Sequence, residues 1–343
     1  MFNVTGLIEK AFENDNVLIN LNHIARDYAK SDQKLIRAPN CFNDDINVFF
    51  TLIDSFLSCK TIRSLSINLS CIIVMHWDID RVIRRLAKLL ESQKCPENTF
   101  IDLAANDIIG FNLLTIVLAL SSGRCPKGLH IHLGHNKITE LGAQALAHSL
   151  ISGRAPERLR LNLSGNPMSD GVISLCVALK SGACPEQFYL DLRMVDLTER
   201  ALCALGTSLA SGRCPKYLTL VLIANRMQAI DWLIHALKSN NCPQGLTIFT
   251  ACNLFNEGYI ILLLLPLLMQ RCTPIGFNLT FNCLRQGDAD IAVHALMALA
   301  PGSFPFKTRI DLPMHPEFKR INALFIENDK VHQDKFLALA TLL

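Results

Sequence analysis

The residues LHIHLGHN (Leu129–Asn136) and LRLNLSGN (Leu159–Asn166) follow one pattern and lie 30 residues apart in the chain. In each stretch a leucine or isoleucine occupies the first, third and fifth positions, and an asparagine closes it. Alternation with a period of two is typical of a short β-strand with one buried face. The asparagine amide can hydrogen-bond backbone groups of the following turn that would otherwise be buried unpaired. We therefore interpret each stretch as a strand followed by a turn that asparagine holds.

The pattern recurs when the chain is aligned on the Cys-Pro or X-Pro pair that precedes most of these strands. The unit starts are separated by 28 to 34 residues and lie at Thr61, Cys95, Cys125, Ala155, Cys184, Cys214, Cys242, Cys272 and Phe304. The first start lacks the proline. We expect looser strands near the C-terminus, such as Ile275-x-Phe277-x-Leu279. The turn asparagine recurs as Asn106, Asn136, Asn166, Asn225, Asn253 and Asn282. Val195 and His315 interrupt this series, so their turns must satisfy the backbone differently.

A helical period fills the second half of each unit. Nine and five residues before Ala155, for example, stand Leu146 and Leu150, and this i, i+4 spacing places both on one helix face. Two residues before most starts is a glycine or asparagine, which fits a left-handed residue at a helix C-terminus. These positions are Gly123, Gly153, Gly182, Gly212, Asn240 and Gly302.

This unit resembles the leucine-rich repeat of the ribonuclease-inhibitor type, with the motif L-x-L-x-L-x-x-N. The resemblance implies an α/β leucine-rich-repeat solenoid, a horseshoe of about nine repeats with a parallel sheet on its concave face and helices on its convex face. We expect three regions: a mostly helical N-terminal capping region over 1–60 with a possible strand near Val17–Leu21, the repeat array over 61–315, and a helical C-terminal cap over 316–343.

Composition excludes several classes of protein. Half of the 343 residues are hydrophobic and 18% are charged, which excludes a disordered polyelectrolyte. The formal charge of +3 gives no basis for electrostatic nucleic-acid binding. The longest apolar run, Tyr259–Met269, contains Pro266 and is shorter than the ~20 residues that span a bilayer, so we expect no membrane insertion.

Thirteen cysteines are not arranged as a disulfide or zinc framework. Six hold the first position of a repeat, where we predict buried, inert packing residues: Cys95, Cys125, Cys184, Cys214, Cys242 and Cys272. The sequence has no Cys-x-x-Cys pair. We therefore expect the protein to work in a reducing compartment.

The strand positions that alternate with the buried ones predict a binding surface on the concave face. We expect partner contacts from Asp102, His130, His132, Arg160, Asn162, Tyr189, Asp191, Arg193, Val221, Phe249 and Arg309, with Val221, Ile223 and Phe249 as an apolar strip. Alternatives are a partner on the convex face or at a terminal edge.

A second hypothesis is an enzyme or metal site built on the concave histidines. His130 and His132 share a strand face and could chelate a metal, whereas we place His135 in a turn. The motif supplies no further fixed ligand, and the sequence contains no P-loop, G-x-G-x-x-G or G-x-S-x-G motif. We therefore predict a non-catalytic interaction scaffold without a metal or cofactor.

The unit SGRCPKGLHIHLGHNKITELGAQALA (Ser122–Ala147) is also similar to the leucine-rich-repeat effectors of intracellular bacteria such as Legionella. That family is exported by a type IV secretion system through an uncleaved C-terminal signal. The resemblance implies delivery to the host cytosol, a host protein as partner, and a secretion signal within 316–343. The N-terminus has no basic region followed by an apolar core, so we expect no classical signal peptide. We expect a monomer.

Overall fold

The structure is a computed structural model. It describes residues 16–20, 50–51, 53–54, 57, 64–72, 78–228, 230–254, 264, 266–268, 270, 272–280, 294, 296–303, 305–311 and 318–340. The chain forms two compact units. Unit 1 comprises Met1–Leu175 and Ala183–Tyr189, and unit 2 comprises Cys176–Gly182 and Leu190–Leu343.

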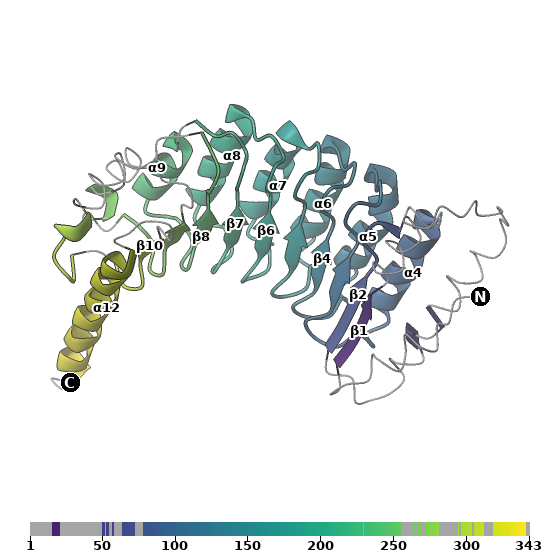
Figure 1. The fold of residues 1–343 in the computed structure, drawn as a ribbon, viewed down its shortest axis with the longest axis horizontal. Coiled ribbons are helices and arrows are strands. Elements are labelled where there is room, and N and C mark those ends of the chain that lie inside the picture. The colour runs from purple at the N-terminus through teal and green to yellow at the C-terminus, as the bar shows by residue number, and fades with distance from the viewer. Residues whose placement is uncertain are drawn as a thin grey trace. The chain divides into compact units, whose positions relative to one another are not determined.

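Unit 1 alternates parallel strands with helices. Its strands pair in the order of the sequence and are β1 (Asn16–Asn20), β2 (Ser64–Asn68), β3 (Phe100–Asp102), β4 (His130–His132) and β5 (Arg160–Asn162). Its helices are α4 (Ile79–Glu91), α5 (Gly110–Ser121) and α6 (Glu140–Ile151), followed by the 3-10 turn η2 (Ser169–Gly171). The three helices lie side by side on one face of the sheet (Figure 1). Helix α7 (Val172–Leu179) begins in unit 1 and ends in unit 2.

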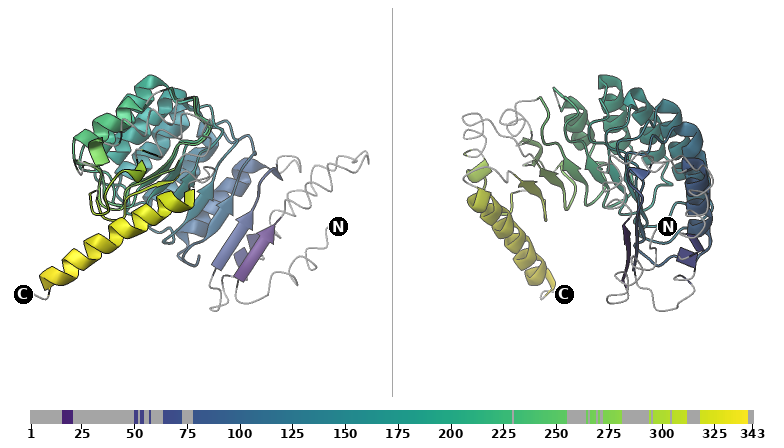
Figure 2. Two further views of the ribbon diagram at one scale, coloured as in Figure 1. Left: turned by 60° about the vertical axis from the view of Figure 1, so that its left-hand side comes forward. Right: turned by 45° about the vertical axis from the view of Figure 1, so that its right-hand side comes forward.

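Unit 2 repeats the same alternation. Strand β6 (Tyr189–Asp191) starts at the last residue of unit 1, and the following elements are α8 (Glu199–Leu209), β7 (Thr219–Val221), α9 (Asp231–Lys238), β8 (Thr247–Phe249), β9 (Asn278–Thr280), β10 (Arg309–Asp311) and α12 (Phe318–Ala340). Strands β7 to β10 pair in parallel in that order. Helix α12 is one long helix that contacts β10 (Figure 2).

The predicted α/β leucine-rich-repeat solenoid is confirmed, with an open parallel sheet. Its core is a column of strand residues that occupy the same position in successive repeats. In unit 1, Ile67, Ile101, Ile131 and Leu161 are in register and almost fully buried. Because no single repeat can bury both its strand and its helix, each depends on its neighbours for this core.

Both ends of the chain contain described elements. The expected strand near Val17 is β1, which pairs with β2 along its whole length. In the predicted N-terminal capping region, the described residues between 50 and 57 are helical, and the rest lies outside the described residues. Helix α12 occupies most of the predicted C-terminal region.

Asparagine side chains join the turns of unit 1 to one another. The Asn136 carboxamide oxygen accepts the backbone N–H groups of Asn106 (2.8 Å) and Ile108 (3.1 Å) of the preceding repeat. Its Nδ2 group donates to the carbonyl oxygens of Leu103 (3.0 Å) and Leu133 (2.9 Å). With a further bond to Gly134 O at 3.2 Å, one buried side chain bonds five backbone groups from two turns, as the sequence predicts.

The same arrangement repeats in both units. Asn166 accepts from Ile138 N–H at 3.0 Å, and in unit 2 Asn253 accepts from the N–H groups of Asn225 (2.8 Å) and Met227 (3.1 Å). At the interruption, Val195 is buried and its N–H donates to Asn225 Oδ1 at 2.9 Å. That turn therefore replaces the amide with an apolar side chain. Asn282 and His315 lie outside the described residues.

One expected strand pattern is wrong by two residues. Ile275 was expected to be the first buried residue of its strand, but it lies in a turn and is exposed. In the observed register Leu279 pairs with Ile248, so Phe277 and Leu279 are the buried pair. Ile275 is apolar and lies two residues before Phe277, so it fits the period of two although it belongs to the turn. The strand itself extends to Thr280.

The helix ends explain why cysteine suits the start of a repeat. The thiols of Cys95, Cys125 and Cys214 each donate to a backbone carbonyl six residues earlier, in the last turn of the preceding helix, at 3.5, 3.3 and 3.2 Å. Cys184 and Cys214 are buried, whereas the other four are only half-buried, so the expectation of six buried thiols is corrected.

We predict that Asn136→Ala destabilises the protein by about 3–4 kcal/mol, because it removes the acceptor of the buried Asn106 and Ile108 N–H groups. Urea unfolding followed by circular dichroism measures this change. Asn241→Ala is the control, because its exposed amide makes a single bond, to Ala210 O at 3.1 Å, and its loss should cost less than about 1 kcal/mol. Equal costs for the two variants would contradict the structural role of the buried asparagine.

Thiol reactivity provides a second test. Burial raises the pKa of Cys95, Cys125, Cys176, Cys184 and Cys242 to about 12. Among the described cysteines, the native protein at pH 8 should therefore react with iodoacetamide first at Cys203 and Cys252, which are both exposed. Peptide mass spectrometry measures the order, with urea-unfolded protein as the control. Alkylation of Cys125 as fast as Cys203 would contradict the packing that we describe.

Candidate functional site

The candidate site is the sheet face of unit 1 that points away from the helices. In each strand the central residue is buried and the two residues beside it point to the opposite face. We call this surface the open face of unit 1. It comprises Ser66, Asn68, Phe100, Asp102, His130, His132, Arg160, Asn162 and Tyr189.

The first strand positions form a row of aromatic and cationic side chains. Phe100 and His130 meet edge to face with ring centroids 4.7 Å apart. Farther along, the Arg160 guanidinium lies 4.3 Å from the ring centroid of Tyr189, in cation–π geometry. Arg160 is exposed, and the three rings are half-buried. Contacts within the row thus hold these side chains in place before a partner binds.

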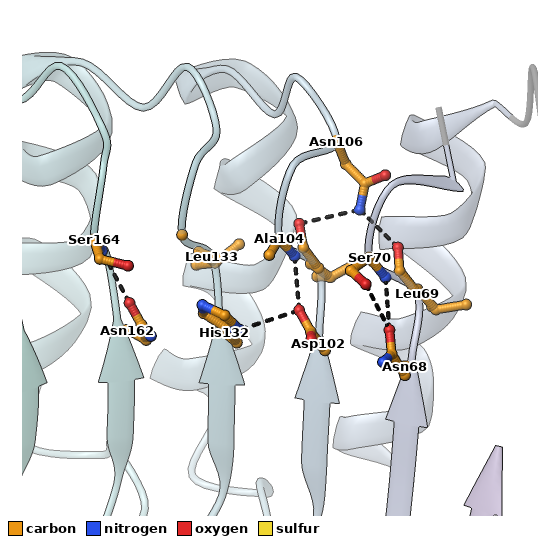
Figure 3. A network of polar contacts seen from close by, with 12 residues as sticks. Asn68, Leu69, Ser70, Asp102, Ala104, Asn106, His132, Leu133, Asn162 and Ser164 are labelled. Carbon is orange, nitrogen blue, oxygen red and sulfur yellow. Dashed lines mark hydrogen bonds and ion pairs between the residues drawn. The ribbon is translucent and has the colours of Figure 1, made fainter. Parts of the chain in front are cut away.

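The last strand positions form a parallel row of polar side chains (Figure 3). Asn68, Asp102 and Asn162 each use a side-chain oxygen to accept the N–H two residues ahead, at 2.9–3.0 Å. This short loop ends the strand and fixes each side chain in place. At the same position His132 instead reaches sideways, with Nδ1 3.2 Å from Asp102 Oδ1.

Asp102 interacts with the polar and charged groups around it in this row. Burial alone would raise its pKa, but hydrogen bonds from His132 and the Ala104 N–H, with the nearby charges of His132 and His130, outweigh burial and lower the pKa. The carboxylate is therefore ionised at neutral pH. Because it accepts from Nδ1, it assigns the proton of a neutral His132 to that nitrogen.

The corresponding face of unit 2 contains two arginine–carboxylate pairs. Arg193 holds Asp191 through Nε (3.0 and 2.9 Å) and Nη2 (2.7 Å). Arg309 binds Asp329 of α12 at 2.5 Å. Phe249 and Ile223 are half-buried on the same face. Most of its charge is thus already neutralised within the unit.

Three residues expected to face solvent are buried, which corrects the sequence-based surface. Asp191 is 1% exposed because its own Arg193 covers it. Val221 is 4% exposed, and its register neighbour in the next strand is the larger Phe249. Asn162 is buried while bonded to Ser164 N–H. Neighbouring strands are only ~4.8 Å apart, so a small side chain is covered by a larger one beside it.

The structure brings together more of the predicted residues in unit 1 than in unit 2. Asp102, His130, His132, Arg160 and Tyr189 all lie on the open face of unit 1. Sequence reasoning missed Phe100 and Asn68 on this face. Phe100 was detectable, because it is in register with His130.

The described residues contain no group of three or more histidine, cysteine, aspartate or glutamate side chains that could hold a metal ion. His130 and His132 occupy one strand face, as expected, but His132 Nδ1 is already directed at Asp102. His135 lies in a turn, with a φ of +54°. The arrangement offers hydrogen bonds and aromatic surface for recognition.

Comparison of the sequence with protein-family models and with curated proteins found no match. Within the described part of the chain, no helix combines the length and the apolar character needed to cross a bilayer.

The lowered pKa of Asp102 predicts a pH-dependent contribution to stability. Its carboxylate should stabilise the folded state above its unfolded pKa of about 3.9, and this contribution should be lost as the pH falls through the lower folded pKa. We predict that Asp102→Asn reduces the free energy of unfolding by about 1 kcal/mol at pH 6, and by progressively less below pH ~4.

Urea unfolding between pH 3 and pH 6 measures this difference. Asp107→Asn is the control, because Asp107 is exposed and pairs with Lys137 at 2.8 Å on the surface. A cost of Asp102→Asn that is the same at both ends of the pH range would contradict the assignment.

Proposed function

We propose that this protein is a non-catalytic scaffold that binds another protein through the open face of unit 1. The observation that carries the proposal is the row of Phe100, His130, Arg160 and Tyr189, in which each side chain contacts a neighbour in the row. Tyrosine and arginine are enriched among residues that dominate the energy of protein interfaces.

Preorganisation supports this proposal. Binding usually costs side-chain entropy, because flexible groups must be immobilised at the interface. Here the Tyr189 ring already stacks with Arg160, and the Asp102–His132 pair holds the adjacent row. A partner that offers an acidic group beside an apolar surface would match Arg160 and the aromatic side chains.

We further propose that the partner is a host protein and that this chain is a bacterial effector. The support is the similarity of the Ser122–Ala147 unit to the leucine-rich-repeat effectors of intracellular bacteria. On this proposal the chain is exported by a type IV secretion system, reaches the host cytosol and acts as a monomer. The C-terminal segment around α12 would then contain the export signal.

Replacing Arg160 and Tyr189 tests the proposal. We predict that Arg160→Ala/Tyr189→Ala weakens binding of the partner at least tenfold, because the two side chains form the preformed end of the row. Tagged protein would be incubated with host-cell lysate, and the bound proteins would be quantified by mass spectrometry and then titrated individually.

Arg213→Ala/Tyr217→Ala is the matched control, because it removes the same residue types from exposed positions before β7. Partners should be lost from the first variant and kept by the control. If every partner enriched by the wild-type protein is retained by Arg160→Ala/Tyr189→Ala, the open face of unit 1 is not the binding surface.

A further inference from the structure

The helical side of unit 1 carries an exposed apolar surface that the proposed partner-binding face does not use. Phe111, Leu114 and Leu118 follow one another at i, i+3 and i+7 on α5 and share one face of that helix. Phe111 is 76% exposed and Leu118 is 61% exposed. Helix α5 has no ionisable side chain along its whole length. Packing in the core does not explain why α5 has apolar side chains on its solvent-facing side.

The neighbouring helix α6 extends this surface. Leu141 is 73% exposed and occupies the position of Phe111 in the next repeat, 30 residues later. The two helices approach closely at their first turns: a Cβ atom placed on Gly110 would lie 3.4 Å from Gly142 N. Gly110 precedes Phe111, and Gly142 follows Leu141. Glycine at both positions therefore allows Phe111 and Leu141 to lie on adjacent turns of the two helices.

The other neighbour, α4, supplies positive charge at matching positions. Arg84 and Lys88 are exposed and lie 30 residues before Leu114 and Leu118, at the same places in the preceding repeat. Helix α4 contains four basic and two acidic residues. A basic helix thus adjoins an apolar helix, and α4 packs directly against α5 (Figure 1).

Not every helix of the array is apolar at these positions, although α7 has Ile173 and the exposed Val177 there. In α9 the positions that correspond to Leu114 and Leu118, counted from the following repeat start, are Asp231 and His235, and both are exposed. The repeat fold itself therefore does not require exposed apolar residues there. The acidic residues of the three helices are Asp80, which hydrogen-bonds Asn112, and Glu91 and Glu140 near helix ends.

We propose that the face made by Arg84, Lys88, Phe111, Leu114, Leu118 and Leu141 docks on the surface of a membrane that contains anionic lipids. Apolar side chains that stand above their surroundings can enter the boundary between headgroups and acyl chains, while adjacent basic side chains bind anionic headgroups. The stripe from Phe111 to Leu118 is about 10 Å long, which suits shallow docking. The strong exposure of these side chains favours a fluid surface over a rigid protein groove.

This docking would leave the open face of unit 1 accessible, because the helices and that face lie on opposite sides of the sheet. The membrane would then hold the protein while the sheet binds its partner. The inference does not depend on the proposed function, since it rests on the outward residues of α4, α5 and α6 alone.

Vesicle sedimentation tests the inference with the full chain. We expect the protein to pellet with vesicles of phosphatidylcholine containing about one third phosphatidylserine, and to remain in solution with phosphatidylcholine alone. Phe111→Ser/Leu118→Ser and Arg84→Gln/Lys88→Gln should each reduce binding at least tenfold. Binding by the wild-type chain should also weaken in about 0.5 M NaCl, since salt screens the basic residues.

Two matched controls replace exposed residues of the same kinds elsewhere: Leu254→Ser/Ile275→Ser and Arg213→Gln/Lys216→Gln. Both should bind as the wild type does, and circular dichroism checks that each variant is folded. If the serine variant does not fold, the glutamine variant and the salt dependence still decide the outcome. The proposal would be overturned if the wild-type chain did not bind the vesicles, or if Arg84→Gln/Lys88→Gln bound them as well as the wild type. Absence of binding by the wild-type chain would favour an acidic amphipathic helix of another protein as the occupant of this face.

Discussion

The structure depends on one requirement: in the described repeats, the turns after the strands have backbone N–H and C=O groups that face the interior and need partners. Asparagine meets it because its side chain carries both an acceptor and a donor. The Asn136 amide binds Asn106 N–H at 2.8 Å on one side and Leu133 O at 2.9 Å within its own turn. Each asparagine therefore fixes its own turn and joins it to the turn of the neighbouring repeat.

This coupling determines the two surfaces that we connect with function. Once successive turns are fixed to one another, the strands that precede them must be in register. The side chains of unit 1 then form two rows on the open face, one with Arg160 and Tyr189 and one with Asp102 and His132. The helices that follow the turns are equally constrained, so residues 30 apart, such as Arg84 and Leu114, occupy equivalent places on adjacent helices. Recognition can therefore change by substitution without a change of fold.

Much of the fold could be predicted from the sequence, because its periods reflect backbone geometry. The strand around Ile131, the turn at Asn136 and the left-handed Gly123 were all predicted from residue type and spacing. The error at Ile275 arose because an apolar residue in a turn imitates a strand position, and only the pairing of Leu279 with Ile248 decides between them.

Less of the candidate site could be predicted, because exposure depends on neighbouring strands. Asp191 is at an outward position, but its own Arg193 covers it, and the sequence does not indicate this contact. The sideways bond from His132 to Asp102 likewise joins residues 30 positions apart. Phe100 belongs to the same row as His130, and the alternation that identified the histidine could also have identified it.

Hydrogen–deuterium exchange of individual turn amides tests the central claim most directly. If asparagine side chains bind the backbone across repeats, the N–H groups of Ile108 and Ile138 should be protected as strongly as the strand amide of His130, which donates to Thr99 O at 2.9 Å. Exchange of Ile108 and Ile138 at the rate of an unstructured peptide, with His130 still protected, would contradict the account.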